Sequence, residues 1–412
     1  MKFILIFGAG KSATNLIEYL GKACDENDWN LLVCDSNLQS AQSKISGFKN
    51  AKALSADVSD AMQRASLIQK ADIVISMLPP HLHFLVARDC VDHSKHLLTA
   101  SYIDDKIKFL EKEIKEKKLL FLCEMGLDPG IDHMSAMKII DRLKKNGGEI
   151  ISFKSHCGGL VAPESDDNPW HYKITWNPGN IVMAGSSGAM YKRDGETVKL
   201  LYEDVFADCT EVVVPELFAL AWYPNRDSLS YVSTYGLEDI NTFIRTTLRD
   251  PSFCRGWNKI VNLGFTNLND HEIIKECSTY SEWFNKKVNI FFADKKQRPG
   301  ISPAGKEKLL DVEFTNQLDY LGMREDVALM DGFTSSASLL QHLLETRLAI
   351  TPEDKDMVVM LHEIGYMMNA ERKMISSSLI VKGTDQVHTA MAKTVGLPLG
   401  IAAKLLMQEK IK

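Results

Sequence analysis

The chain has 412 residues, of which 45% are hydrophobic and 25% charged, the ordinary mixture of a globular protein with two or three domains. This composition excludes a largely disordered chain. The formal net charge of −6 provides no general attraction for nucleic acid or for an anionic membrane. Any anionic ligand must therefore be bound by local positive groups.

The apolar runs at 3–7 and 73–78 are far shorter than the roughly 20 residues that are needed to cross a bilayer. Residues 1–8 look like the start of a signal sequence, but this run leads into a glycine motif that requires it as a strand. The eight cysteines contain no C-x-x-C pair, so we expect reduced thiols. We expect a cytoplasmic protein with no nucleic-acid partner and no membrane partner.

The first third of the chain alternates short β-rich runs with helical stretches, a pattern typical of βαβ units around a parallel sheet. We expect strands at 3–7, 30–34, 51–55, 73–77, 96–99 and 119–123. Six strands of this kind predict a doubly wound Rossmann sheet.

A different architecture is expected after this sheet. A helix at 132–145 is stopped by two glycines, and strands follow at 150–157 and 172–176. Residues 235–375 are mainly helical by pattern, and so is the stretch at 390–406.

The predicted fold class is α/β: a Rossmann doubly wound parallel sheet with a mixed α+β substrate domain that contains a helical part. We assign residues 1–131 to the Rossmann domain, completed by 385–412, and residues 132–384 to the substrate domain, with its helical subdomain near 235–375.

A G-x-G-x-x-A motif directly follows the first expected strand and opens a helix. Gly8 allows a tight turn, Gly10 lets the backbone approach a pyrophosphate, and the small Ala13 permits close packing of helix on strand. The helix N-terminus supplies free N–H groups for the anion. Such a hexapeptide can also be a purely structural turn.

Asp35 ends the second expected strand, where a carboxylate can accept hydrogen bonds from the adenosine ribose hydroxyls. The alternative is that Asp35 only starts a turn with Ser36 and Asn37. A carboxylate here favours NAD, because NADP would place a phosphate beside it and no arginine stands at 34–37. NADP remains the alternative cofactor, since Lys11 could partly compensate.

The loops after the other strands complete the expected cofactor site. Asp57 and Val58 would lie near the adenine, and the end of the fourth strand could line the ribose and nicotinamide, although its prolines also fit a simple loop. The residues assigned to cofactor binding are Gly8, Gly10, Lys11, Ser12, Ala13, Asp35, Asp57, Val58, Ser76, Leu78, Pro79, Thr99 and Ser101.

The densest cluster of polar residues, at 124–133, follows the sixth strand, and ligands bind at the carboxyl ends of such strands. Asp128 is restricted by the following proline to an extended conformation, which would fix its carboxylate. Asp132 is read as a helix N-cap, and for His133 packing and catalysis stay open.

The run Gly-Leu-Asp-Pro-Gly-Ile-Asp-His at 126–133 resembles the most characteristic stretch of saccharopine dehydrogenases, also called saccharopine reductases. Further similar segments occur in the same order along the chain, at 99–103, 156–164, 168–169, 172–173, 223–228 and 247–249. The chain departs from the family pattern at His156, where tyrosine is usual, at Val161, where proline is usual, and at Thr246, where glycine is usual. These departures leave the exact substrate open.

The resemblance implies oxidation of the secondary amine of saccharopine and hydrolysis of the imine to glutamate and 2-aminoadipate 6-semialdehyde, or the reverse, in lysine metabolism. Asp128 would position the amine and assist proton transfer. Cys157 is either a covalent nucleophile or, as we favour, a pocket residue, because imine hydrolysis needs only water as the nucleophile. The residues expected to bind substrate are Ser101, Tyr102, Asp128, Cys157, Gly158, Arg226 and Arg245, with Arg249 in reserve.

Two rival readings remain: a related imine reductase of polyamine metabolism, of the carboxynorspermidine dehydrogenase or homospermidine synthase type, and a catalytically silent nucleotide-sensing protein. As partners we expect a small amino-acid substrate and leave a homodimer open. No metal site is expected, because His81 and His83 would share a face only in a strand, whereas this segment starts a helix.

Overall fold

The computed structural model describes residues 2–296 and 309–412. They form two compact units. Unit 1 consists of Met1–Lys138 and Val381–Lys412, and unit 2 of Ile139–Ile380.

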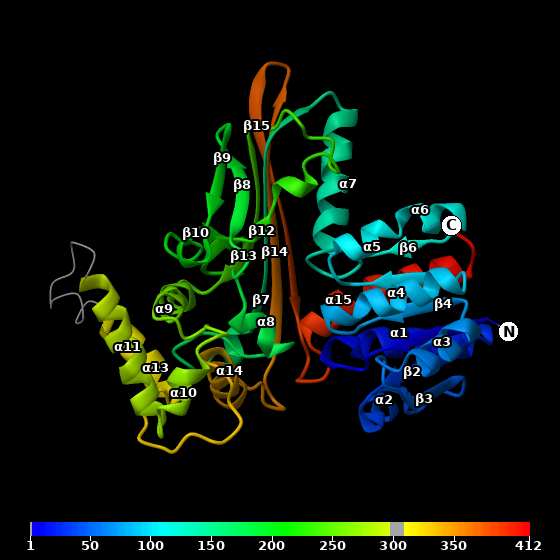
Figure 1. Cartoon of the computed structure of the whole chain (residues 1–412). Coiled ribbons are helices and arrows are strands. Elements are labelled where there is room, and N and C mark those ends of the chain that lie inside the picture. Colours follow the sequence, from blue (N-terminus) through cyan, green and yellow to red (C-terminus); the bar gives the residue numbers. More distant parts are fainter. Residues whose placement is uncertain (1, 297–308) are drawn as a thin grey trace. The chain divides into compact units, whose positions relative to one another are not determined.

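In the described part of unit 1, six parallel strands form one sheet in the order β3-β2-β1-β4-β5-β6 (Figure 1). The strands are β1 Phe3–Phe7, β2 Asn30–Asp35, β3 Ala51–Ser55, β4 Ile73–Ser76, β5 His96–Thr99 and β6 Phe121–Leu122. This is the strand order of a doubly wound dinucleotide-binding sheet, which confirms the predicted fold class. The sixth strand is shorter than the expected 119–123.

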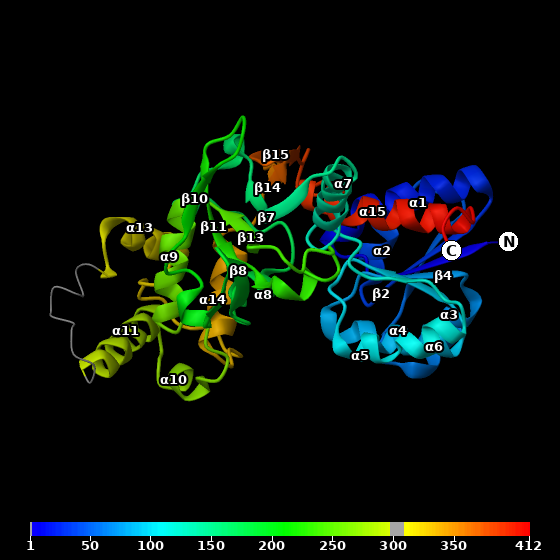
Figure 2. The same ribbon diagram turned by 90° about the horizontal axis from the view of Figure 1, so that it is seen from above.

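Helices cover both faces of this sheet (Figure 2). The helices of this unit are α1 Thr14–Asn27, α2 Leu38–Ile45, α3 Ala61–Lys70, α4 His83–Asp92, α5 Asp105–Phe109, α6 Glu111–Glu116, the first half of α7 Ile131–Lys145, and α15 Ala390–Met407, with short 3-10 turns η1 Lys11–Ala13 and η2 Pro80–Leu82. The central strand alternates between two cores: Ile4 and Ile6 belong to one, and Leu5 and Phe7 to the other. Both faces of β1 are therefore buried, which explains its unbroken apolar sequence.

Helix α15 brings the end of the chain back to the beginning, beside α1 in both ribbon views (Figures 1 and 2). Leu399, Ala403 and Leu406 share a core with Leu16 of α1. By length and composition α15 is apolar enough to cross a membrane, which corrects the expectation that every apolar stretch is too short. Most of the helix is buried inside unit 1, so its apolar surface is accounted for by packing.

Unit 2 contains, in its described residues, a nine-stranded mixed sheet whose main path is β10-β11-β13-β7-β14-β15. The strands are β7 Glu149–Val161, β8 Ala189–Arg193, β9 Glu196–Leu200, β10 Thr210–Val213, β11 Ala219–Pro224, β12 Arg226–Asp227, β13 Thr242–Arg249, β14 Asp356–Met368 and β15 Glu371–Lys382. β13 runs parallel to β7, and β14 runs antiparallel to β7 on its other side.

The helical part of unit 2 packs around three fully buried tryptophans, Trp170, Trp257 and Trp283. Its helices are α8 Pro178–Val182, α9 Pro251–Asn262, α10 His271–Lys275, α11 Tyr280–Lys296, α13 Val312–Leu321 and α14 Ser336–Arg347, and the unit also holds the 3-10 turns η3 Pro163–Ser165, η4 Tyr202–Asp204 and η5 Leu229–Tyr231.

Two expectations for unit 2 are wrong. Residues 172–176 form no strand, only an isolated bridge between Ile174 and Ala349. The span 235–375 is not helical throughout, because β13 lies before its helices and β14 after them. Both of these strands are buried almost continuously. β14 is a largely apolar run without alternation, which cannot be told from a buried helix by its pattern, and β13 mixes apolar, threonine and arginine residues without alternation.

Gly8 lies in the tight turn that follows β1. Gly8 has a φ of 101°, and a Cβ atom on it would lie 2.7 Å from the carbonyl oxygen of Met77. Gly8→Ala should therefore lower the free energy of unfolding of unit 1 by roughly 2–4 kcal/mol, from the positive φ and the backbone clash. Urea unfolding followed by circular dichroism measures the change.

Gly10→Ala is the matched control. Gly10 has a φ of −65°, and no atom outside its chain neighbours lies within 4 Å of an added Cβ. Its unfolding midpoint should equal that of the parent protein. Equal shifts in the two variants would contradict the steric account.

Candidate active site

The glycine loop leaves its second glycine open. The Gly8 N–H donates to the carbonyl oxygen of Cys34 at 2.8 Å, which holds the turn against β2. Gly10 is exposed, whereas Ala13 is buried at the start of the helical segment. Lys11 and Ser12 lie in η1, next to the open glycine. The loop therefore has the shape that a pyrophosphate needs for a close approach to backbone.

Asp35 is fixed at the end of β2 by backbone donors on both sides. Its Oδ2 accepts from the Ala9 N–H at 2.7 Å and its Oδ1 from the Asn37 N–H at 2.8 Å. The carboxylate thus contacts both the glycine loop and the turn after β2. It is half-buried and keeps lone pairs for further donors such as ribose hydroxyls.

Lys44 is a cation in this region that the sequence did not reveal. Its Nζ donates to the Gly10 carbonyl oxygen at 2.6 Å and to Thr14 Oγ1 at 2.9 Å. Burial lowers the pKa of Lys44 to about 8, and the nearby carboxylates of Asp35 and Glu18 oppose this shift. A helical residue this far along the chain carries no motif that could have predicted its position at the loop.

The remaining residues assigned to cofactor binding lie at or after the carboxyl ends of other strands of this sheet. Asp57 is exposed, and hydrogen bonds from Ser59 lower the pKa of its carboxyl. Val58 is buried. Leu78 and Pro79 lie between β4 and η2, while Ser76 and Thr99 are the last residues of β4 and β5. Because the strands are parallel, all these positions lie at one edge of the sheet.

Ser101 and Tyr102 follow β5 and are both half-buried. The Tyr102 hydroxyl donates to Asp128 Oδ1 at 3.0 Å, so the structure brings two of the predicted substrate residues together. The loop that carries Asp128 is tied to the end of β5, because the Met125 N–H donates to the Thr99 carbonyl oxygen at 3.1 Å.

Asp132 and His133 have partners within unit 1. The helix begins at Ile131, so Asp132 is its second residue and not the N-cap that we predicted. Its Oδ1 nevertheless accepts from the Gly130 N–H at 2.7 Å, at the start of the helix. His133 Nε2 lies 3.3 Å from a carboxylate oxygen of Glu124.

His83 is a second residue whose place in the site the sequence did not reveal. It is the first residue of α4, in agreement with the expected helix start, and it is buried between two serines. Its Nδ1 lies 2.8 Å from Ser76 Oγ and its Nε2 lies 2.7 Å from Ser101 Oγ. Burial lowers the pKa of His83 to about 4, so the ring is neutral near pH 7.

Within the described residues no cluster of three His, Cys, Asp or Glu side chains could hold a metal.

In unit 2 three of the residues that we expected to bind substrate, Cys157, Gly158 and Arg245, lie on the neighbouring strands β7 and β13. Cys157 of β7 is opposite Thr247 of β13, and both Cys157 and Arg245 are buried. A Cβ atom on Gly158 would lie 2.5 Å from the Leu248 carbonyl oxygen, so this glycine is required by close strand packing. Arg226 is exposed in the two-residue strand β12, which pairs with β8 and not with β13.

Arg249, held only in reserve by the sequence, is the most unusual charge in unit 2. Its side chain is 6% exposed, and it stacks over Tyr172 at 5.1 Å. Its Nη1 donates to the Leu248 carbonyl oxygen at 2.7 Å, while its Nε has no hydrogen-bond partner in the described part of the chain. Within the described residues no carboxylate forms an ion pair with it, and the neighbouring ionisable groups are tyrosines and cysteines.

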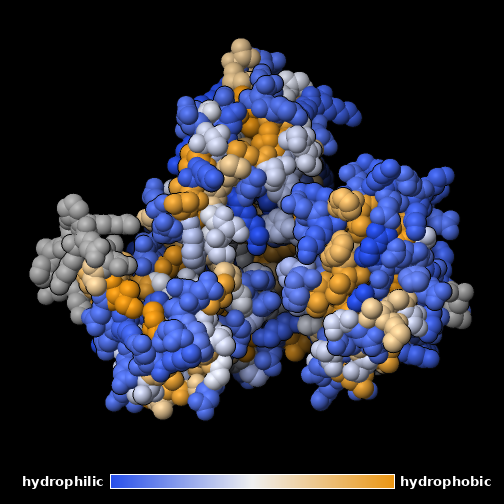
Figure 3. All heavy atoms as spheres, in the orientation of Figure 1, coloured by the Kyte–Doolittle hydropathy of each residue, from blue (hydrophilic) through white to orange (hydrophobic). Residues whose placement is uncertain are grey.

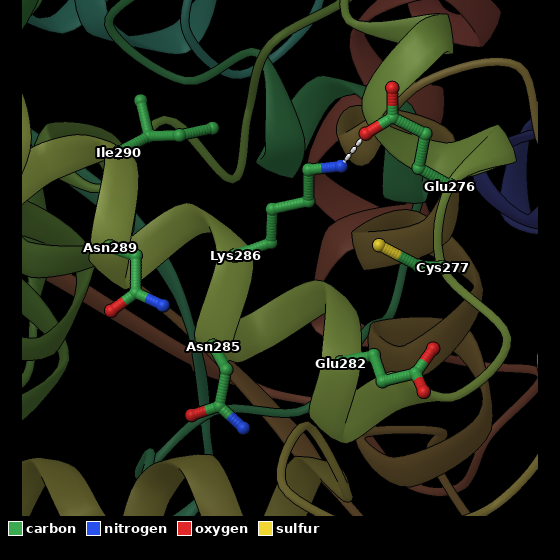
Figure 4. A pocket seen from close by; sticks show the side chains of 7 residues that line it. All are labelled: Glu276, Cys277, Glu282, Asn285, Lys286, Asn289 and Ile290. Carbon is green, nitrogen blue, oxygen red and sulfur yellow. Dashed lines mark hydrogen bonds and ion pairs between the residues drawn. The ribbon is translucent and has the colours of Figure 1, made fainter.

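The helical part of unit 2 also has a surface depression, away from the residues that we expected to bind cofactor or substrate. It is lined by Glu276, Cys277, Glu282, Asn285, Lys286, Asn289 and Ile290 (Figure 4). Its walls carry an ion pair between Lys286 and Glu276, so its main cation is already neutralised. The predicted residues all lie elsewhere. The surface in Figure 3 is largely hydrophilic, with apolar groups in separate small areas.

The comparisons with known proteins agree with the resemblance. Residues 4–122 match the saccharopine dehydrogenase NADP binding domain, and residues 126–412 match the saccharopine dehydrogenase C-terminal domain. The chain is 33% identical to the alpha-aminoadipic semialdehyde synthase of Arabidopsis thaliana, over 96% of this chain and 39% of that protein. It therefore spans less than half the length of this relative.

Shorter relatives are matched over nearly their full length. The L-glutamate-forming, NADP(+) saccharopine dehydrogenase of Schizosaccharomyces pombe is 30% identical, over 99% of this chain and 91% of that protein. The apo structure of saccharopine dehydrogenase (L-Glu forming) from Saccharomyces cerevisiae superposes with a TM-score of 0.86 at 28% identity, over 100% of this chain and 92% of that one. The chain belongs to the saccharopine dehydrogenase family.

Proposed function

We propose that this protein oxidises the C–N bond of saccharopine with NAD and water, giving L-glutamate and 2-aminoadipate 6-semialdehyde, in a reversible step of lysine metabolism. The observation that carries the proposal is the buried Arg249 guanidinium, which has no acidic partner among the residues that the structure describes. A buried charge without a partner is costly, and a ligand carboxylate would compensate it. The shorter relatives are saccharopine dehydrogenases, which supports the same substrate.

Arg249 also discriminates against the polyamine alternative. A guanidinium binds a carboxylate through two parallel hydrogen bonds, and saccharopine carries three carboxylates. A polyamine would instead bring positive charge to a buried cation. Arg226 and Arg245 supply two further guanidiniums for the remaining carboxylates.

The reaction requires removal of a hydride from C6 of the lysine-derived part and loss of the amine proton. A nicotinamide nucleotide, when bound, would supply the hydride acceptor, and a base must accept the proton. Water then adds to the imine carbon, and the carbinolamine releases glutamate as its amine. Asp128 is the proposed acid–base group, with its carboxylate oriented by the Tyr102 hydroxyl. Cys157 is buried beside Arg249 and is proposed to shape the pocket.

We further propose that NAD is preferred to NADP, although the relatives are named for NADP. Asp35 presents a fixed carboxylate where the adenosine ribose binds, and it would repel a 2′-phosphate. Lys44, near Asp35, could offset part of this repulsion. We also propose a cytoplasmic location: no two of the eight cysteines, all within the described chain, form a disulfide.

Asp128→Asn should lower kcat by about 10²–10⁴-fold at saturating substrates, because the amide cannot take part in proton transfer. NAD binding, followed by fluorescence titration, should be unchanged. Tyr102→Phe is the companion variant: it removes only the donor to Asp128 and should lower kcat by about tenfold. A folded Asp128→Asn enzyme with parental kcat, when chemistry limits turnover, would refute the assignment.

Arg249→Met should raise the KM for saccharopine by roughly 100-fold or more, since charge-assisted hydrogen bonds to a carboxylate are lost. Its melting temperature should stay the same or rise, because an uncompensated buried charge is removed. Arg193→Met, at an exposed arginine of β8, is the control and should leave KM unaltered. Parental saccharopine saturation in the Arg249 variant would exclude it from the site.

The nucleotide preference is tested by comparing kcat/KM for NAD and NADP. The parent enzyme should favour NAD by about tenfold or more, and Asp35→Ala should narrow this ratio by removing the repelling charge. Lys44→Gln should weaken NADP more than NAD. A parent enzyme that prefers NADP would overturn the proposal.

A further inference from the structure

Two serines at the carboxyl edge of the unit 1 sheet are connected by one buried histidine. Ser76 ends β4, and Ser101 follows the neighbouring strand β5. His83 contacts both, through Nδ1 to Ser76 Oγ at 2.8 Å and through Nε2 to Ser101 Oγ at 2.7 Å. Ser76 is fully buried, His83 is nearly so, and Ser101 is half-buried. Ser101 is thus the one member of the three that a ligand could reach.

The direction of each hydrogen bond follows from the partners of the Ser76 hydroxyl. Within the described chain, the Ser76 hydroxyl has a single hydrogen-bond partner, His83 Nδ1. If Nδ1 carried the ring proton, it would donate to Ser76, and the buried Ser76 O–H would be left without an acceptor, which is unfavourable. The satisfied arrangement has the Ser76 O–H donating to Nδ1, and the neutral ring then carries its proton on Nε2.

The Nε2–H consequently donates to Ser101 Oγ. Ser101 Oγ makes no other hydrogen bond among the described residues, and its backbone N–H is already engaged with Thr99 Oγ1. With one lone pair occupied by His83, the Ser101 hydroxyl hydrogen is directed away from the ring. It is available to an acceptor on a bound molecule.

We propose that His83 is a positioning residue: it holds Ser101 as a hydrogen-bond donor for an acceptor oxygen of the bound ligand, a substrate carboxylate or the nicotinamide carboxamide. The choice of these ligands rests on the proposed function. His83 touches neither ligand itself and acts through Ser101.

Two conservative variants separate the two contacts of His83. The amide of asparagine can take the place of Nδ1, so His83→Asn keeps the contact with Ser76 and loses the one with Ser101. The amide nitrogen of glutamine can take the place of Nε2, so His83→Gln keeps a donor to Ser101. If His83 acts through Ser101, His83→Asn lowers kcat/KM for saccharopine by about tenfold, the effect of one hydrogen bond, and His83→Gln stays within about threefold of the parent.

A double-mutant cycle with Ser101→Ala tests the same connection. In the Ser101→Ala background, His83→Asn should cause less than about threefold further loss, because the group that it positions is absent. Separate titrations identify the acceptor: weaker NAD binding indicates the carboxamide, whereas a raised KM for saccharopine with unchanged NAD binding indicates a substrate carboxylate. Multiplicative losses in the double variant, or a larger defect in His83→Gln than in His83→Asn, would overturn the proposal.

The protonation of the His83 ring can be measured without any turnover of substrate. Nitrogen-15 NMR of histidine-labelled protein at pH 7, with the His83 signals identified by their loss in His83→Asn, reports which ring nitrogen carries the proton. The Nε2–H form is expected, and an Nδ1–H form or a protonated ring would refute the inference. If the enzyme fails to oxidise saccharopine, the proposed function falls, while this spectrum and the NAD titrations still decide the role of His83.

Discussion

The close contact between Gly8 and the Met77 carbonyl is the constraint on which the nucleotide site depends. A Cβ atom at Gly8 would lie 2.7 Å from that oxygen, so β1 and β4 can end side by side only with glycine at this position. The turn that results directs the Ala9 N–H to Asp35 and leaves Gly10 open. One missing side chain therefore determines both which backbone of the glycine loop is left open and where the carboxylate of Asp35 is held.

The candidate site residues include a carboxylate in unit 1, Asp35, and a buried guanidinium in unit 2, Arg249. The acidic group at the nucleotide site, Asp35, is bound by neutral backbone donors, which hold it in place without neutralising it. In unit 2 the Arg249 guanidinium is buried among aromatic rings and thiols, and burial beside it raises the pKa of Tyr223 to about 12, so this tyrosine is no counterion at neutral pH. An unneutralised buried cation selects for an anionic ligand more strongly than a surface arginine would, because the surrounding dielectric is low.

Much of unit 1 could be predicted because its signals are local. A short apolar run that leads into the glycine motif marks β1, and the glycine motif and Asp35 are defined by their position next to strands. His83 and Lys44 could not be found this way, because their roles come from contacts with residues that are brought close only by the sheet: Ser101 for His83 and Gly10 for Lys44. Asp132 was misplaced by two positions for a similar reason, since its partner is a backbone N–H of the preceding turn.

The errors in unit 2 have another physical origin. β13 and β14 are covered on both faces, so they lack the alternation that distinguishes a half-exposed strand. Arg249 was held only in reserve because an arginine in a sequence is usually a solvated surface residue. Only the structure reveals that it is buried and that its Nε has no hydrogen-bond partner among the described residues.

The nucleotide site also depends on the far end of the chain. Gly396 of α15 approaches α1 so closely that a Cβ atom would lie 3.0 Å from the Leu16 backbone nitrogen and 3.2 Å from the Ser12 carbonyl oxygen. Ser12 belongs to η1, the segment directly after the glycine loop, so α15 supports the backbone next to that loop. The core around Leu16 is completed by Leu399 and Ala403, which the chain supplies last. The dinucleotide fold is thus encoded mainly in the first third of the sequence, but its stability at the loop requires residues nearly 400 positions later.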